Sequence, residues 1–412
     1  GQDITLELTE SLPTGRTYQS YLQLVPGVLP SATGNPASRS GVNFADVNGV
    51  IGQSTDNAYY IEGINVTDNN SGTFGANLNT EIIQEQSALT GGLPAEYVGV
   101  PGLVSNVVTK SGGNSLSGSL NYFFQDDSLV ADNKNRPNSV FSTYDAALTL
   151  GGPIVRDKAW FFGSYRLLNR EEDVTLPSGS FLRAVTTDQE QGFGKVSWTI
   201  TQNDLLAVTF LTDPFERDGS TGSDVLNNRS ISREQGGERA SLRYTRVFGD
   251  FVFEAAYSDH SSDINDIPAD LSTLNNISFR PTDARSIQEE QIGGGGQQSL
   301  NTRSNTSYDL SGEWNLDSSF GNHTFKAGAV RNEGESFNSL SLGTAGATYT
   351  SIASRYAGLN LTASQAAAFS RIVFNPAVTS DFNGLINAIN SSASRAQLYA
   401  LLDADGNGSI SA

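Results

Sequence analysis

Hydrophobic and polar side chains alternate with a period of two along most of the second part of the chain. In SLSGSLNYFF, Ser115–Phe124, serine and asparagine occupy one face up to Asn121, and leucine, glycine and tyrosine occupy the other up to Tyr122. TSYDLSGEWNL, Thr306–Leu316, splits in the same way. Such alternation gives an extended strand one polar and one apolar face. The pattern predicts strands at Leu116–Gln125, Thr143–Leu150, Ala159–Asn169, Phe193–Ile200, Asp204–Leu211, Glu238–Phe248, Phe251–Asp259, Thr306–Leu316 and Asn322–Asn332.

The connections between these strands alternate between short and long. The short ones include Gly151–Lys158 and the Gly-Asp pair at 249–250. The long, polar ones are Asp126–Ser142, Arg170–Gly192, Thr212–Gly237 and His260–Asn305. Short turns at one rim and long loops at the other are typical of an up-and-down barrel in an outer membrane. A soluble β-sandwich is the alternative, but it has no reason to segregate its loops in this way.

The first part of the chain, residues 1–114, has a mixed pattern that predicts a small α/β domain. Strands are expected at DITLEL, NAYYIEGINV and LVSNVVTK, a short helix at TYQSYLQLV, and a helix or strand at TEIIQEQSAL. Glycine-, asparagine- and serine-rich loops separate them, and loops of this kind often carry recognition. We expect this domain to be enclosed by the sheet that begins near Leu116, because the inner faces of the strands are polar enough to line it.

Composition agrees with a mostly β protein and restricts its partners. Only 37% of the 412 residues are hydrophobic, 42 are glycine, and the net charge of -19 makes binding to nucleic acid unfavourable. No apolar run approaches the roughly 20 residues of a membrane helix, so a membrane crossing requires a closed barrel. The chain has no Cys and no Met, and its start at Gly1 indicates a processed or partial chain.

Nine strands are too few to close around a domain of more than 100 residues, because small barrels enclose little beyond side chains. We therefore expect residues 115–412 to form the N-terminal portion of a larger barrel with an open sheet edge. Ala412 is then expected inside an extracellular loop, with further strands after it.

Five segments of the chain form a recognisable combination: LPTGRTYQSYLQLVPGV, NAYYIEGINVTD, EYVGVPGLVSNVVTKSGGNSLSGSLNYFF, LGGPIVRDKAWFFGSYR and NHTFKAGA. Together the first four resemble the TonB-dependent outer-membrane transporters, specifically the Oar-like subgroup, and NHTFKAGA is similar to a later barrel strand of that family. Glu62 stands where the family usually has Asp in an I-D-G turn, and Val100 and Pro101 interrupt a run that is usually made of small residues.

The resemblance implies a large transmembrane barrel holding an N-terminal plug, here residues 1–114. It implies contact with outer-membrane lipid, coupling to the TonB complex and movement of an unidentified ligand. DITLEL is at best a remnant of the TonB box. The candidate ligand-contact or plug-contact residues are Arg16, Glu62, Glu85 and Glu96.

A second candidate site lies at the end of the chain. In LLDADGNGSISA, the residues Asp403, Asp405, Asn407, Ser409 and Ser411 match alternating ligand positions of an EF-hand calcium loop, after a predicted short helix. This pattern predicts a calcium-binding, partly helical extracellular loop within 333–412. The alternative is a solvated Asp-Gly and Asn-Gly turn.

Two functions remain open at this point: a plugged transporter, or a calcium-stabilised scaffold or adhesion protein that holds other surface proteins. The sequence offers no constellation for an enzyme. The two histidines, His260 and His323, lie far apart and are expected to be structural or solvated.

Overall fold

The computed structural model describes two β units. The described residues are 2–5, 21–22, 24–30, 47–49, 56–68, 70, 72, 75–97, 99–131, 140–175, 181–219, 230–269, 278–279, 292–293, 297–342, 348–349 and 373–374. Within these ranges, no helix has the length and apolar character needed to cross a membrane.

The first unit is a small mixed sheet with the strand order β1-β6-β7-β4-β5. Its strands are β1 Gln2–Thr5, β4 Ala58–Ile61, β5 Ile64–Asn65, β6 Ile83–Leu89 and β7 Val104–Thr109. Only β4 and β7 pair in parallel. Its core includes the buried Ile4, Tyr59, Ile82 and Leu103. We call the described residues up to Lys110 the plug.

Local sequence explains how β6 begins. The predicted helix or strand at TEIIQEQSAL is a short 3-10 helix, η3 Thr80–Ile82, followed by β6. The Asn79 side chain caps this turn by accepting a hydrogen bond from the Glu81 N–H. Of the helix predicted at TYQSYLQLV, Tyr21 and Leu22 are helical, Leu24 and Val25 form a turn and a bend, and the other positions lie outside the described residues. The partly helical loop predicted from residue 333 onward is wrong at its start, because residues 333–342 continue the strand Gly321–Leu342, which pairs with Gln297–Ser318. Most of the rest of that predicted loop lies outside the described residues.

The second unit is a large antiparallel sheet, which we call the barrel wall. Its continuous path follows the order β19-β18-β15-β14-β12-β11-β10-β9-β8, with β13 paired to β11 and β14. The strands are β8 Ser117–Asp126, β9 Phe141–Val155, β10 Ala159–Thr175, β11 Phe181–Thr201, β12 Asp204–Thr212, β13 Phe215–Asp218, β14 Ile231–Phe248, β15 Phe251–Pro268, β18 Gln297–Ser318 and β19 Gly321–Leu342. All nine predicted strands are present.

Smaller elements complete the described chain. They are the strands β2 Leu29–Pro30, β3 Val47–Gly49, β16 Ser278–Phe279, β17 Ile292–Gly293, β20 Thr348–Tyr349 and β21 Val373–Phe374, and the 3-10 helix η4 Asp127–Leu129.

The predicted long connections are wrong in extent. Most strands continue well past their predicted ends on the side away from the short turns. The expected loop Arg170–Gly192 is largely strand, because β10 continues to Thr175 and β11 begins at Phe181. In this region Arg170 pairs with Thr187 and Glu172 with Val185. Strands pair through their backbones, so a strand can continue where its outer face no longer contacts lipid. In that part no apolar side chains are needed, and the alternation of polar and apolar residues therefore ends before the strand does.

The two faces of the barrel wall differ in chemistry as predicted. On β9, Asp145 and Thr149 are buried while Leu148 and Leu150 are exposed; on β10, Arg166 is buried among the inward-facing residues. The inner face is therefore polar and the outer face apolar, the reverse of a soluble protein and the arrangement expected for a membrane barrel.

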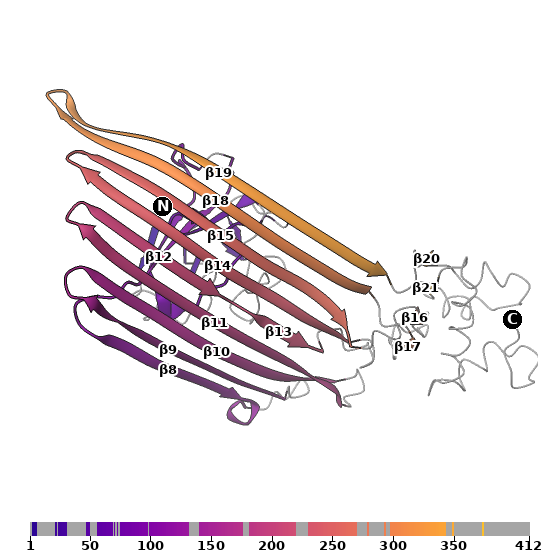
Figure 1. Ribbon diagram of the computed structural model, residues 1–412. Coiled ribbons are helices and arrows are strands. Elements are labelled where there is room, and N and C mark those ends of the chain that lie inside the picture. Colours follow the sequence, from indigo (N-terminus) through magenta and orange to yellow (C-terminus); the bar gives the residue numbers. More distant parts are fainter. Residues whose placement is uncertain are drawn as a thin grey trace, which may run out of the picture.

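The plug lies against one face of the barrel wall, seen behind the long strands in Figure 1, and its backbone and side chains form hydrogen bonds with residues of that face. The first unit therefore packs against the polar face of the sheet and does not lie apart as a separate domain, while its enclosure on all sides stays a prediction. Strands β8 and β19 form the two edges of the sheet and are not paired with each other in the described part of the chain. The predicted open edge is therefore present. The plug sheet ends at Thr109 and the barrel wall begins at Ser117.

Candidate functional site

The candidate functional site is the interface between the plug and the inner face of the barrel wall. One part of this interface is apolar, because Phe162, Phe193, Leu211 and Phe215 of the wall belong to the same buried cluster as the plug core. Around it lie several polar contacts and ion pairs that join residues far apart in sequence. These contacts decide how the plug is held.

The first polar contact is built on the turn between β4 and β5. Glu62 and Gly63 both have positive φ angles, 53° and 72°. The Glu62 carboxylate accepts hydrogen bonds from the Thr109 N–H at 2.7 Å and from the Lys195 Nζ of β11 at 2.9 Å. A Cβ atom at position 63 would lie 2.8 Å from the Arg243 guanidinium of β14, so glycine allows the turn to approach the wall closely.

The electrostatics of this contact favour an ionised Glu62. The side chains of Lys195 and Glu62 are 7% and 18% exposed, so both charges are removed from most of the solvent. Burial raises the pKa of Glu62, but the Lys195 ammonium and the hydrogen bonds from Thr109 and Lys195 outweigh burial and leave the pKa below its ordinary value of 4.5. The pair therefore links the plug to β11 as a charged contact at neutral pH.

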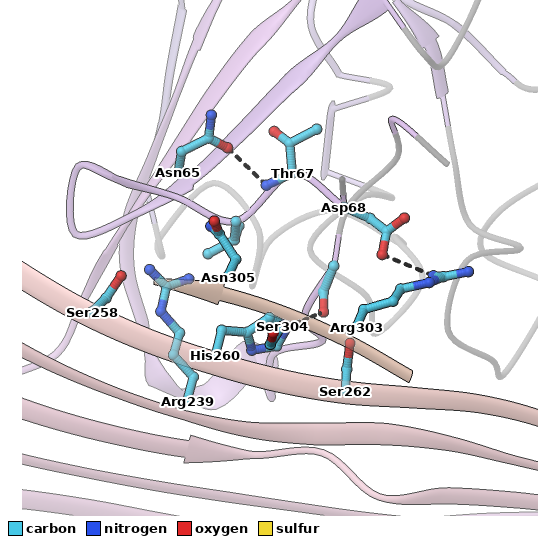
Figure 2. Close-up of a pocket in the computed structure, with 12 residues that line it drawn as sticks. Asn65, Thr67, Asp68, Arg239, Ser258, His260, Ser262, Arg303, Ser304 and Asn305 are labelled. Atoms are coloured by element: carbon cyan, nitrogen blue, oxygen red, sulfur yellow. Dashed lines mark hydrogen bonds and ion pairs between the residues drawn. The ribbon is translucent and has the colours of Figure 1, made fainter. Parts of the chain in front are cut away.

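A second contact involves the plug loop that follows β5. Asp68 accepts a hydrogen bond from Arg303 of β18 at 2.8 Å, and the Gly75 carbonyl lies 3.1 Å from His260 Nε2 of β15. Because a carbonyl can only accept, His260 donates from Nε2. Figure 2 shows these residues around a pocket that the plug loop covers. Its free volume of about 10 Å³ is room for roughly one water molecule.

A third contact places a buried carboxyl group between plug and wall. Asp213, in the break between β12 and β13, accepts hydrogen bonds from the Asn77 N–H at 2.7 Å and the Gly237 N–H at 2.9 Å. Burial raises the pKa of Asp213 to about 7, although these two backbone hydrogen bonds oppose the rise. Nearby, the Asn79 amide donates to the Ser164 hydroxyl at 2.8 Å.

The structure brings only part of the predicted residues to this interface. Glu62 lies in it. Glu96 forms an exposed ion pair with Lys326 of β19 at 2.6 Å, also between plug and wall. Glu85 is half-buried on β6, in register with Thr5 and Val108, so it lies within the plug sheet. Arg16 lies outside the described residues.

The predicted calcium ligands Asp403, Asp405, Asn407, Ser409 and Ser411 also lie outside the described residues, so the calcium loop stays a prediction. In the part of the chain that is described, no group of three or more His, Asp or Glu side chains is arranged to hold a metal ion.

Sequence reasoning missed the partners on the barrel wall. Lys195, Arg239, His260 and Arg303 all occupy inward-facing positions of predicted strands or of their extensions. The sequence feature that could have identified these plug-contacting residues was a basic side chain on the strand face that points away from lipid. His260 has a structural role as expected, but that role is a contact with the plug.

Comparisons with known proteins agree with this architecture. Residues 108–184 match the family model of an outer membrane beta barrel domain. The TonB-dependent transporter Oar of Myxococcus xanthus is 29% identical over 159 residues, which cover 36% of this chain and 14% of that protein.

The fold is similar to two solved structures. The siderophore receptor PirA from Acinetobacter baumannii has a TM-score of 0.59 at 15% identity, with 81% of this chain and 48% of that chain covered. The outer membrane transporter YddB from Escherichia coli has a TM-score of 0.54 at 12% identity, with 82% and 56% covered. The chain thus spans about half the length of these structures and a smaller share of Oar.

These findings confirm the resemblance to the TonB-dependent outer-membrane transporters and the predicted barrel fold. They also confirm that the chain is a protein of the bacterial outer membrane.

Proposed function

We propose that this chain is part of a TonB-dependent outer-membrane transporter, in which the plug closes the lumen and is displaced to let a ligand pass. The observation that carries the proposal is the buried ion pair between Glu62 of the plug and Lys195 of the wall. A pair across such an interface holds the plug in one position, and water can replace its hydrogen bonds when the plug moves.

The remaining contacts support the same reading. The ion pair between Asp68 and Arg303 and the hydrogen bond between Asn79 and Ser164 also connect the plug to the wall. Phe162 and Phe193 add an apolar contact between the wall and the plug core. An interface of mixed, partly polar character suits two parts that separate and rejoin.

Energy for the displacement would come from the TonB complex, as the relationship to the Oar transporter suggests. A direct test compares cells that carry the complete gene in backgrounds with and without TonB. Depletion of compounds from a defined medium is followed by mass spectrometry. The proposal predicts that at least one compound is depleted only when both the gene and TonB are present. Equal depletion without TonB, with the barrel present in the membrane, would contradict it.

A calcium-stabilised surface scaffold on the same barrel is the second candidate. Its support is the ligand spacing at Asp403–Ser411 alone. In that case the medium would be unchanged by TonB, and other surface proteins would co-purify with the barrel only when Ca²⁺ is present.

A further inference from the structure

The segment Ser111–Leu116 joins the plug to the barrel wall, and we call it the linker. It lies between the end of β7 at Thr109 and the start of β8 at Ser117. None of the described strands pairs with it. The linker nevertheless contacts the wall at two points, both at the end of β9 and β10 where a short turn joins these strands (Figure 1). Because neither sheet holds the linker, these contacts decide how firmly it is fixed.

The first point is Gly112, which lies against the backbones of β9 and β10. A Cβ atom at this position would be 2.1 Å from the Phe161 carbonyl oxygen and 2.9 Å from the Gly152 carbonyl oxygen. No side chain fits into this space, so glycine allows the linker to lie directly on the two strands.

The second point is the Asn114 side chain, which forms three hydrogen bonds with the start of β10 and the turn before it. Its amide nitrogen donates to the Asp157 carboxylate at 2.6 Å. Its amide oxygen accepts from the Asp157 N–H at 2.9 Å and from the Trp160 indole N–H at 2.8 Å. Both ends of one amide group are thus bound to the wall. We call Asn114, Asp157 and Trp160 the linker clamp.

The residue at position 157 is unusual for its backbone conformation. Asp157 has a φ angle of 60° in a turn closed by a hydrogen bond from the Lys158 N–H to the Val155 carbonyl. Glycine adopts such an angle without steric cost, whereas other residues do so rarely. Asn114 and Asp157 are both exposed, so burial does not force them together. What aspartate offers and glycine lacks is the carboxylate that accepts from Asn114.

The clamp precedes the most easily broken part of the wall. The first pair between β8 and β9 joins Ser117 to Gly151, directly after the linker. In the described part of the chain, β8 is an edge strand and is paired only with β9. A pull along an unclamped linker would load this single pair, and the strand would then separate from its neighbour one pair at a time.

We propose that the linker clamp is the mechanical boundary between plug and barrel. It fixes the linker to the turn between β9 and β10, so that a pull on the plug ends at Asn114 and does not separate β8 from the sheet. The plug can then be moved or unfolded while the barrel stays whole. The use of this boundary in the cell rests on the proposed displacement of the plug, but the clamp itself can be measured without transport.

The test is single-molecule force spectroscopy of the complete protein in a lipid bilayer, pulled at constant force from its N-terminal end. In the wild type, extension of the plug should end in a long-lived stop before β8 leaves the sheet. Asn114→Ala removes three hydrogen bonds and should shorten the lifetime of this stop by about tenfold. Trp160→Phe removes one donor and keeps a ring, so its effect should be smaller.

Variants at position 157 separate a clamp from an ordinary turn. Asp157→Gly accepts the φ angle of 60° but has no carboxylate, so the stop should be severalfold shorter than in the wild type. Asp157→Asn tolerates the same angle and keeps an oxygen that can accept from Asn114, so it should keep most of the lifetime. A residue that served only the turn would give a glycine variant that lasts as long as the wild type or longer.

Hydrogen exchange gives a second readout, without force. The Asp157 amide donates to Asn114, so its exchange should become severalfold faster in Asn114→Ala. Asn315→Ala is the matched control for both measurements. Asn315 accepts from the Thr324 hydroxyl at 2.8 Å near the short turn between β18 and β19, and its loss should change neither the stop nor the exchange at Asp157.

The proposal is overturned if the wild type shows no stop before β8 separates, if Asn114→Ala keeps the wild-type lifetime, or if Asp157→Gly holds as long as the wild type. Shortened lifetimes in a protein without TonB-dependent uptake would contradict the proposed function and support the clamp. Unchanged lifetimes in a protein with such uptake would contradict the clamp alone.

Discussion

Replacing Lys195 by glutamine is expected to loosen the plug, because it leaves the Glu62 carboxylate buried without its cation. Removing one partner of a buried ion pair costs about 3–5 kcal/mol. Glu62 keeps its hydrogen bonds from the Thr109 N–H and hydroxyl, so we expect a cost at the lower end of this range, about 3 kcal/mol. That corresponds to a change of roughly 100-fold in the ratio of closed to open plug.

The assay is the conductance of the complete protein in planar lipid bilayers as urea is raised. The Lys195→Gln protein should open at a lower urea concentration than the wild type. The double variant Glu62→Gln and Lys195→Gln should open at a concentration nearer the wild type, because no charge is left unpaired. Arg170→Gln is the control, because Arg170 and Glu172 form a half-exposed pair within β10 and should contribute less than about 1 kcal/mol.

Acid provides an independent check on the same pair. The pKa of Glu62 is lowered in the folded protein, so its stabilisation is present above the ordinary value of 4.5 and is lost as the pH falls through the lowered value. The wild type should therefore open more easily as the pH falls below 4.5, and the Glu62→Gln protein should lack this step. If the single and double variants open at the same urea concentration as the wild type, the pair does not hold the plug and the reasoning is refuted.

Three other outcomes are expected. Leu310→Arg on the lipid-facing side of β18 should lower the free energy of unfolding from lipid vesicles by about 2–4 kcal/mol. The neighbouring inward change Asp309→Asn should have little effect. Equal losses for the two variants in urea titrations would contradict the assigned faces. Because the pKa of Asp213 is raised from 3.8 to about 7, the folded protein binds the Asp213 proton more strongly than the unfolded chain does. The free energy of unfolding should therefore fall as the pH rises toward 7. Asp213→Asn should remove this pH dependence in urea titrations between pH 5 and 8. The Asp403→Ala change should abolish calcium-dependent heat in calorimetry of the complete protein at millimolar Ca²⁺, and a wild type without such heat would leave an ordinary surface turn.

Much of the fold follows from local pattern. The alternation in Thr306–Leu316 places Tyr308 and Leu310 outward and Ser307 inward, and the structure has them exposed and buried respectively. The reason is that side chains of a strand alternate between faces whatever the rest of the chain does. The same pattern located the first barrel strand at Leu116 and the turns between neighbouring strands.

Strand length could not be read in this way. Strands β18 and β19 are each 22 residues long, about twice the alternating segments that predicted them. The additional residues pair with each other beyond the lipid-facing band, where neither face must be apolar. A polar sequence there is equally typical of a loop, so only the pairing itself distinguishes the two.

The sequence by itself determined that this chain forms an alternating antiparallel sheet with an apolar outer face, preceded by a small glycine-rich domain, and it marked Glu62 as a charged plug residue. Only the tertiary structure decided its partner, because Lys195 lies 133 positions away and Arg303 lies 235 positions from Asp68. Such pairs depend on which strands become neighbours around the plug and at what level their inward positions meet it. Local sequence preferences do not determine that arrangement, which arises only when the polar face of the sheet packs against the plug.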